Sequence, residues 1–179
     1  ATTLMQDKKF DQSIDILKDI IDECKDDYPR IKGDCYRLLA YIYSRGNQIA
    51  KALDLYKRAL KLFEVANCIR GTLISLNNIG TIYSDTYQDE DTAIGYYYKV
   101  KNLSEEYNIE HFEIVATVNI ACYHESCHNY ELTYRYFKQS LEKAIKGNFY
   151  REVFFLYNVL ARSCLNFNRY TEACNYLKL

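Results

Sequence analysis

Four residues with metal-binding side chains stand close together in the segment CYHESCH, namely Cys122, His124, Cys127 and His128. Thiolate and imidazole are ligands that zinc prefers, and residues four apart share a helix face. Of the four, His124, Cys127 and His128 could share a helix face, and the sequence holds no second cluster that would complete a set of four ligands. His124 also stands where a repeat described below places a tyrosine. We therefore predict that His124 packs in a helical core, and that the chain binds no metal and no cofactor.

Catalytic signatures are absent from the sequence, which has no phosphate-binding glycine loop, no GxSxG and no HExxH. The chain of 179 residues is 49% hydrophobic and 26% charged, a composition typical of a globular protein. The net charge of -1 gives no electrostatic basis for binding nucleic acid, and no apolar run is long enough to cross a membrane. We predict a non-catalytic protein that binds neither nucleic acid nor membrane.

The cysteines indicate a reducing compartment. There are seven of them, an odd number, and no two have CxxC spacing. Several fall where a helix would bury a small apolar side chain. These features favour free thiols in the cytoplasm over a disulfide framework.

The other candidate functional side chains are amides and charged groups, which are suited to recognising a peptide. An asparagine can both donate to and accept from a peptide bond, as Asn77 and Asn158 could. Arg37 and Arg162 could bind a carboxylate with two hydrogen bonds, and Glu125 could meet a basic residue. Whether these groups share a surface depends on the helices that carry them.

A small residue preceded by an aliphatic one recurs at nearly constant spacing. The small residues are Ala40, Gly80, Ala121 and Ala161, which are 40, 41 and 40 residues apart. Positions −4, −1 and +3 from each of them share its helix face. We expect two helices to approach closely there, which explains a glycine inside a helix although it costs about 1 kcal/mol relative to alanine.

A second set of positions indicates a partner helix in each repeat. Small residues at Ala52, Ala93, Thr133 and Ala173 are each followed four positions later by a large one, in Tyr56, Tyr97, Phe137 and Leu177. Similar spacing near the start predicts that the chain opens on the second helix of an incomplete repeat. The spacing of 41 places one extra residue in the loop SDTYQDED.

These two elements resemble the tetratricopeptide repeat. The matches are aliphatic-Gly/Ala-x-x-Tyr, as in Ile79, Gly80 and Tyr83, and Ala-x-x-x-Tyr/Phe, as in Ala52 and Tyr56. The period of about 40 exceeds the usual 34, and the proline that normally ends each unit is missing. We attribute both departures to one cause. The second helix of each unit runs on, as in YKRALKLFEVANC, and therefore needs no sharp stop.

Long-period arrays of this kind are similar to the sensor domains of Gram-positive peptide-pheromone receptors, the RRNPP group of quorum-sensing regulators. The resemblance implies a short peptide bound on the concave face and often a helix-turn-helix domain before the repeats. The array also resembles scaffold proteins that bind partner-protein segments in animal cells.

In such a superhelix the first helix of each repeat lines the inner groove. Positions −6, −3, +1 and +4 from the small residue lie off the packing face. They carry a mixture of polar residues and apolar ones such as Val115, Val118 and Phe155. Position −2 lies closer to the packing seam. The predicted peptide-binding residues are Arg37, Tyr41, Asn77, Asn78, Thr81, Asn119, Glu125, Asn158 and Arg162.

The resemblance implies that the asparagines of this set hold a peptide backbone. Two simpler readings stay open. Asn78 and Asn119, at position −2, could instead bond a neighbouring helix. Arg37 and Arg162 could be solvated surface charges.

We predict an all-α, TPR-like superhelical solenoid of antiparallel helix pairs, a single domain of about four and a half repeats. The predicted units span 1–31, 32–69, 70–110, 111–149 and 150–179. The predicted function is peptide or protein binding, as the ligand-sensing part of a bacterial transcription regulator or, alternatively, as a constitutive adaptor.

The lack of an initiator methionine and the incomplete last repeat predict a fragment of a longer chain. Helices at broken ends should leave open apolar surface at Phe10, Leu17, Tyr176 and Leu177. A second copy could pack there, so the sequence is compatible with a homodimer.

Overall fold

The computed structural model describes residues 2–24, 28–166 and 169–177, and these residues are helical apart from short turns. No strand occurs among them. Seven helices, α2 to α8, have 17 residues each. The helices are α1 (Thr2–Glu23), α2 (Pro29–Arg45), α3 (Ile49–Val65), α4 (Ile69–Asp85), α5 (Glu90–Glu106), α6 (Glu110–Ser126), α7 (Tyr130–Lys146), α8 (Tyr150–Asn166) and α9 (Tyr170–Leu177).

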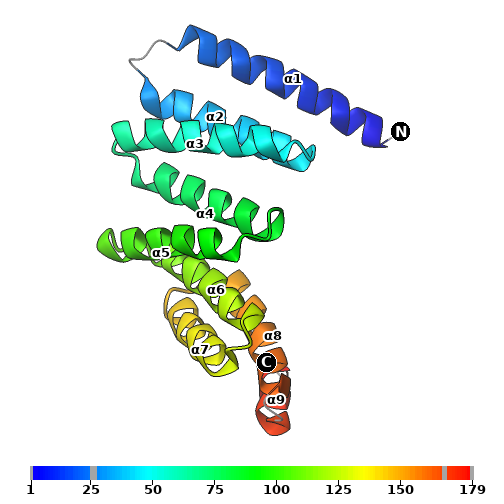
Figure 1. Ribbon diagram of the computed structural model, residues 1–179, viewed down its shortest axis with the longest axis vertical. Helices are drawn as coiled ribbons and strands as arrows, with labels where there is room; N and C mark the ends of the chain where they lie inside the picture. The colour runs from blue at the N-terminus through cyan, green and yellow to red at the C-terminus, as the bar shows by residue number, and fades with distance from the viewer. Residues whose placement is uncertain (1, 25–27, 167–168, 178–179) are drawn as a thin grey trace. The chain divides into compact units, whose positions relative to one another are not determined.

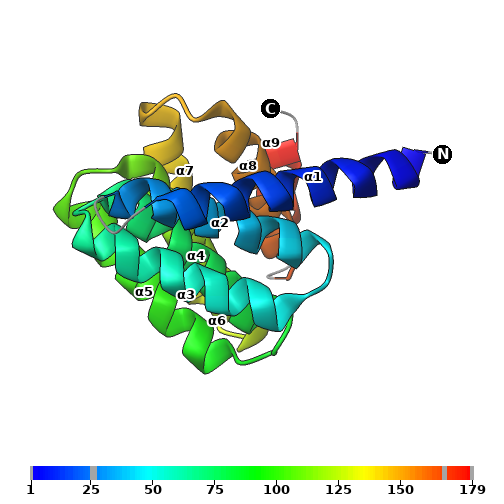
Figure 2. The same ribbon diagram turned by 90° about the horizontal axis from the view of Figure 1, so that it is seen from above.

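The helices fall into two compact units, residues 1–89 with α1 to α4 and residues 90–179 with α5 to α9. Within each unit every helix packs antiparallel against the next one along the chain (Figure 1). Figure 2 shows α2 and α3 of the first unit side by side from a second direction. The predicted TPR-like architecture of antiparallel helix pairs is confirmed.

The repeating small residues lie in the core, as predicted. Ala40, Gly80, Ala121 and Ala161, on α2, α4, α6 and α8, are all buried, so these are the first helices of the repeats. The partner positions Ala52, Ala93, Thr133 and Ala173 on the second helices are buried as well. The Thr133 hydroxyl of α7 donates to the Ala121 carbonyl of α6 at 3.4 Å. A side chain as short as threonine can reach the backbone of the next helix only where the two helices approach closely.

Each of the six turns that connect the helices from α2 to α8 contains one residue in the left-handed region. These residues are Asn47, Asn67, Gln88, Asn108, His128 and Asn148, with φ between 49° and 58°. In most of these turns the next N–H reaches back five residues, as from Gln48 to the Tyr43 carbonyl at 2.8 Å. This is the Schellman motif, which ends a helix with one residue in the left-handed conformation. Asparagine adopts that conformation more readily than most other residues do.

These turns correct our interpretation of the long period and the missing prolines. The second helices do not run on: α3 ends at Val65 and α5 at Glu106, and the first helices are equally long. The extra length is therefore shared by both helices of a pair, and a sharp stop does exist in the left-handed residue. The extra residue predicted in SDTYQDED is present, because the linker 86–89 is one residue longer than 46–48 or 127–129.

The fully buried ring of Phe63 fixes the packing of the first unit. A Cβ on Gly71 of α4 would lie 2.5 Å from this ring, and one on Gly33 of α2 would lie 3.0 Å from it. A side chain at Gly71 would therefore collide with the ring, and one at Gly33 would crowd it.

The predicted apolar ends are exposed only in part. Phe10 and Leu177 are exposed, at 39% and 63%, whereas Leu17 and Tyr176 are half-buried. Tyr176 packs against the core of the second unit, where its hydroxyl meets that of Tyr134 at 3.3 Å. Leu179 lies outside the described residues. No described helix is both long and apolar enough to cross a membrane.

Candidate functional site

The first helices of the second unit, α6 and α8, enclose a mostly apolar cleft. It has a volume of about 300 Å³, near the lower end for ligand sites, and so has room for one large side chain. Ile114 and Leu156 are fully buried beneath it, and Phe155 on α8 is 47% exposed. Its lining residues are Ile114, Val115, Val118, Asn119, Arg151, Glu152, Phe155 and Leu156. The structure thus brings Asn119 together with the apolar groove positions predicted beside it.

An ion pair joins the same two helices nearer their C-terminal ends. The Arg162 guanidinium donates to the Glu125 carboxylate at 2.8 Å, from α8 to α6. The two residues were predicted as separate contacts for a ligand, but each satisfies the other. Because the Arg162 side chain is 60% exposed, this pair contributes little stability, and a ligand could compete for it.

Asn158 lies on the exposed surface of α8. Its amide donates to the Phe154 carbonyl, one turn earlier in the same helix, at 2.8 Å. Phe154 itself is 74% exposed and does not line the cleft. Asn158 therefore has a partner within its own helix and stands outside the cleft.

Sequence reasoning missed the two charged residues of the cleft. Arg151 and Glu152 stand at −10 and −9 from Ala161, one helical turn before Phe155 at −6. Extending the predicted face by one turn towards the start of α8 would have found them. The Nδ1 of His111 on α6 lies 3.7 Å from the Glu152 carboxylate.

In the first unit, three predicted residues gather around the buried Tyr56. Asn78 of α4 hydrogen-bonds the Tyr56 hydroxyl on α3, and Arg37 and Tyr41 of α2 are near enough to act on it electrostatically. Burial raises the pKa of Tyr56 to about 12, against the opposing effects of Arg37 and Asn78. This geometry agrees with the simpler reading of Asn78, in which it bonds a neighbouring helix.

Two of the candidates in the first unit, Arg37 and Thr81, are also bonded within their own helices. Arg37 pairs with Asp34 one turn earlier on α2, at 3.2 Å. The Thr81 hydroxyl donates to the Asn77 carbonyl at 3.1 Å, a common bond within a helix. Tyr41 is exposed, and Asn77 is half-buried.

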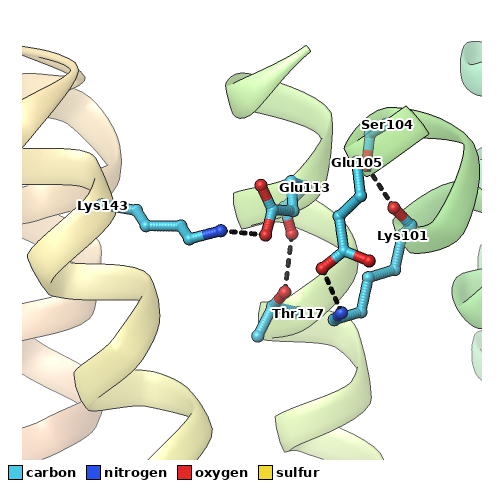
Figure 3. A network of polar contacts seen from close by, with 6 residues as sticks. All are labelled: Lys101, Ser104, Glu105, Glu113, Thr117 and Lys143. Atoms are coloured by element: carbon cyan, nitrogen blue, oxygen red, sulfur yellow. Dashed lines mark hydrogen bonds and ion pairs between the residues drawn. The ribbon is translucent and has the colours of Figure 1, made fainter. Parts of the chain in front are cut away.

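A network of charges links α5, α6 and α7 beside the core (Figure 3). The Glu113 carboxylate is largely buried and pairs with Lys143, while Glu105 pairs with Lys101. The hydrogen bond and charge of Lys101 hold the pKa of Glu105 below its usual value, although partial burial opposes the shift. The Lys143–Glu113 pair joins α7 to α6, whereas the Lys101–Glu105 pair lies within α5, and a hydrogen bond between Glu105 and Glu113 connects the two pairs.

The residues of CYHESCH point to separate neighbours. The His124 ring stacks on Tyr136 with centroids 5.6 Å apart, in the packing role that its repeat position predicted, and burial lowers its pKa. Cys127 is hydrogen-bonded to Tyr123, and His128 Nδ1 lies 2.8 Å from the Tyr130 hydroxyl. Among the residues that the structure describes, no three potential ligands gather to hold a metal ion.

Comparison with solved structures shows the fold. The chain superimposes on RapI in its apo form with a TM-score of 0.80 and 20% identity, over 92% of this chain and 59% of that one. It matches BtubC (BKLC) from P. vanneervenii with a TM-score of 0.81 and 16% identity, covering 97% and 72%. It matches aspartyl phosphate phosphatase F from Bacillus subtilis with a TM-score of 0.71 and 17% identity, covering 95% and 54%.

The chain thus spans little more than half the length of the two Rap-type structures, RapI and phosphatase F. The tetratricopeptide-like fold inferred from the repeats is confirmed by the likeness to these structures. No protein-family model matches the sequence. No curated protein sequence matches it significantly.

Proposed function

We propose that the chain binds an extended peptide, and that the cleft between α6 and α8 is a principal contact of the second unit. The observation that carries this proposal is an apolar hollow on the first helices, at positions that a repeat groove was predicted to use. Such a hollow takes one apolar side chain of an extended ligand, and surrounding polar groups set its direction.

We further propose that peptide binding serves as the sensing step of a bacterial transcription regulator. The likeness in fold to two Rap-type structures supports this version over other peptide binders. A peptide that binds one arrangement of the helices better than another would shift the population towards it. The alternative is an adaptor that holds a partner protein constantly. A helix-turn-helix domain in the full-length protein would favour the regulator, and a catalytic domain there would favour the adaptor.

The chain is proposed to act without catalysis, in the cytoplasm and without touching nucleic acid. Its seven cysteines are all free thiols, which supports a reducing compartment. One matched structure is named an aspartyl phosphate phosphatase, so acyl phosphate hydrolysis is the activity to test. Release of phosphate from acetyl phosphate, above the rate without protein, would contradict the non-catalytic proposal.

Two adjacent phenylalanines of α8 offer a matched test of the cleft. Phe155→Ala removes a wall of the cleft, whereas Phe154→Ala removes an exposed ring outside it. Binding of short synthetic peptides rich in large apolar residues is measured by fluorescence polarisation. We expect Phe155→Ala to weaken binding about tenfold, because anchors in desolvated pockets dominate affinity, and Phe154→Ala to leave it unchanged. Equal effects of the two changes would remove the cleft from the binding site.

A further inference from the structure

The cleft between α6 and α8 carries a guanidinium without a partner. Arg151 lines the cleft and is exposed, and no described residue makes a hydrogen bond or ion pair with it. The two arginines singled out in the sequence differ in this respect. Arg37 is paired with Asp34, and Arg162 with Glu125. Arg151 is therefore available to an anion brought in by a ligand.

The next residue gives the same end of the cleft an acceptor. The Glu152 side chain is 23% exposed, and the His111 Nδ1 lies 3.7 Å from its carboxylate, too far for a strong hydrogen bond. A donor and an acceptor thus stand on consecutive residues of α8. Below them lies an apolar floor that includes Ile114, Val118 and Leu156.

We propose that this cleft binds the C-terminal residue of a peptide, and that this residue has a large apolar side chain. The inference rests on the proposed function and specifies its ligand. The apolar side chain fills the cleft, the terminal carboxylate accepts two hydrogen bonds from Arg151, and the N–H of the same residue donates to Glu152. A terminal residue carries these three groups on one α-carbon, in the combination that the cleft complements.

Other ligands match fewer of these groups. A peptide that continued past the cleft would place an uncharged amide at Arg151 and gain no ion pair. A basic side chain could pair with Glu152 and an acidic one with Arg151, but either would bring a second charge over the apolar floor and leave that floor unfilled. The free carboxylate beside an apolar side chain is therefore the feature that distinguishes this proposal from peptide binding in general.

The experiment compares each N-acetylated peptide ending in Phe or Leu as the free acid and as the C-terminal amide. Binding is measured by titration calorimetry with the wild-type protein and with Arg151→Gln. Arg135→Gln is the matched control, because Arg135 is also exposed and unpaired but lies on α7, outside the cleft. We expect the free acid to bind about tenfold more tightly than the amide, and only Arg151→Gln to remove this preference.

Arg151 has no partner to lose, so Arg151→Gln should fold normally, which circular dichroism verifies. Equal binding of acid and amide would overturn the proposal, as would equal effects of the two arginine changes. Peptide binding itself would then survive wherever Phe155→Ala still weakens it. Failure of every peptide to bind, in either form, would overturn the proposed function and this inference together.

Discussion

The asparagines predicted as peptide ligands divide by the neighbours that each one meets. Asn119 lines the cleft, Asn158 is bonded within its own helix, and Asn78 bonds Tyr56 across two helices. Offsets along a repeat gave the face of each residue but not its partner. The partner depends on which side chain the adjacent helix presents, here a tyrosine whose hydroxyl is buried.

The bond between Asn78 and Tyr56 predicts a measurable coupling in stability. Asn78→Ala, Tyr56→Phe and the double variant form a cycle, with unfolding followed by urea denaturation. We expect a coupling free energy of about 0.5–1.5 kcal/mol, because each single change leaves a polar group without its partner. Asn77→Ala with Tyr56→Phe is the control and should show additive effects. Additivity of Asn78 and Tyr56 as well would mean that the bond contributes nothing to folding.

Glu105 predicts a pH dependence of stability at the acidic end. Its pKa is lowered in the folded state, chiefly by Lys101, so its stabilisation is complete above the unfolded pKa and is lost as pH falls through the folded pKa. Between about pH 5 and pH 3, Lys101→Met should therefore flatten the fall in unfolding free energy. At neutral pH the loss should stay below about 1 kcal/mol, because the pair is partly exposed.

The control for this prediction is Lys138→Met, a change at an exposed lysine of α7 without a described partner. It should keep the wild-type slope of unfolding free energy against pH. A Lys101→Met variant that also kept this slope would show that Lys101 does not set the pKa of Glu105.

At the scale of helices, the Phe63 ring predicts opposite effects for two glycine substitutions. Gly71→Ala would force a methyl group to 2.5 Å from a fully buried ring and should destabilise the protein by about 1–3 kcal/mol. Gly95→Ala, in α5 with nothing within 4 Å of the new methyl, should stabilise it by up to about 1 kcal/mol. Denaturant midpoints compare the two, and a stabilising Gly71→Ala would contradict the close packing described here.

The helices and their pairing could be predicted because small residues recur at the period of the packing. The places of Gly33 and Gly71 could not, since each is explained by a ring from another helix. The turns at 45–47 and 128–129 carry signals in the sequence, but the sharpness of the helix stops was not predicted. The expected signal for a sharp stop was proline, whereas four of the six left-handed residues that the structure describes are asparagines, a residue type with a second interpretation as a peptide ligand.

At the scale of the whole chain, each compact unit has a core of its own. That of the second unit includes Ile114, Phe137, Leu141, Leu156 and Leu160. We therefore expect a fragment of residues 90–179 to fold alone, with a helical circular dichroism spectrum and a cooperative thermal transition. A fragment that stayed unfolded would show that the second unit depends on the first.

The sequence predicted the helices that border the cleft but not the cleft itself. Val115, Val118 and Phe155 were placed correctly on the first helices. The cleft exists because these side chains leave space between α6 and α8. Its volume depends on how the side chains pack, and the spacing of the sequence repeat does not determine that packing. The charged end at Arg151 was missed because the predicted face was drawn one turn too short.

The uniform stops also bear on how such a chain could grow. Since α6 and α7 with their turns occupy forty residues, a tandem duplication of this block would restart the next helix in the same rotational phase. An insertion of one residue within a helix would instead turn the later side chains of that helix by about 100° relative to its earlier ones and disrupt its packing against its neighbours. The array can therefore lengthen by whole forty-residue helix pairs without changing how its helices pack.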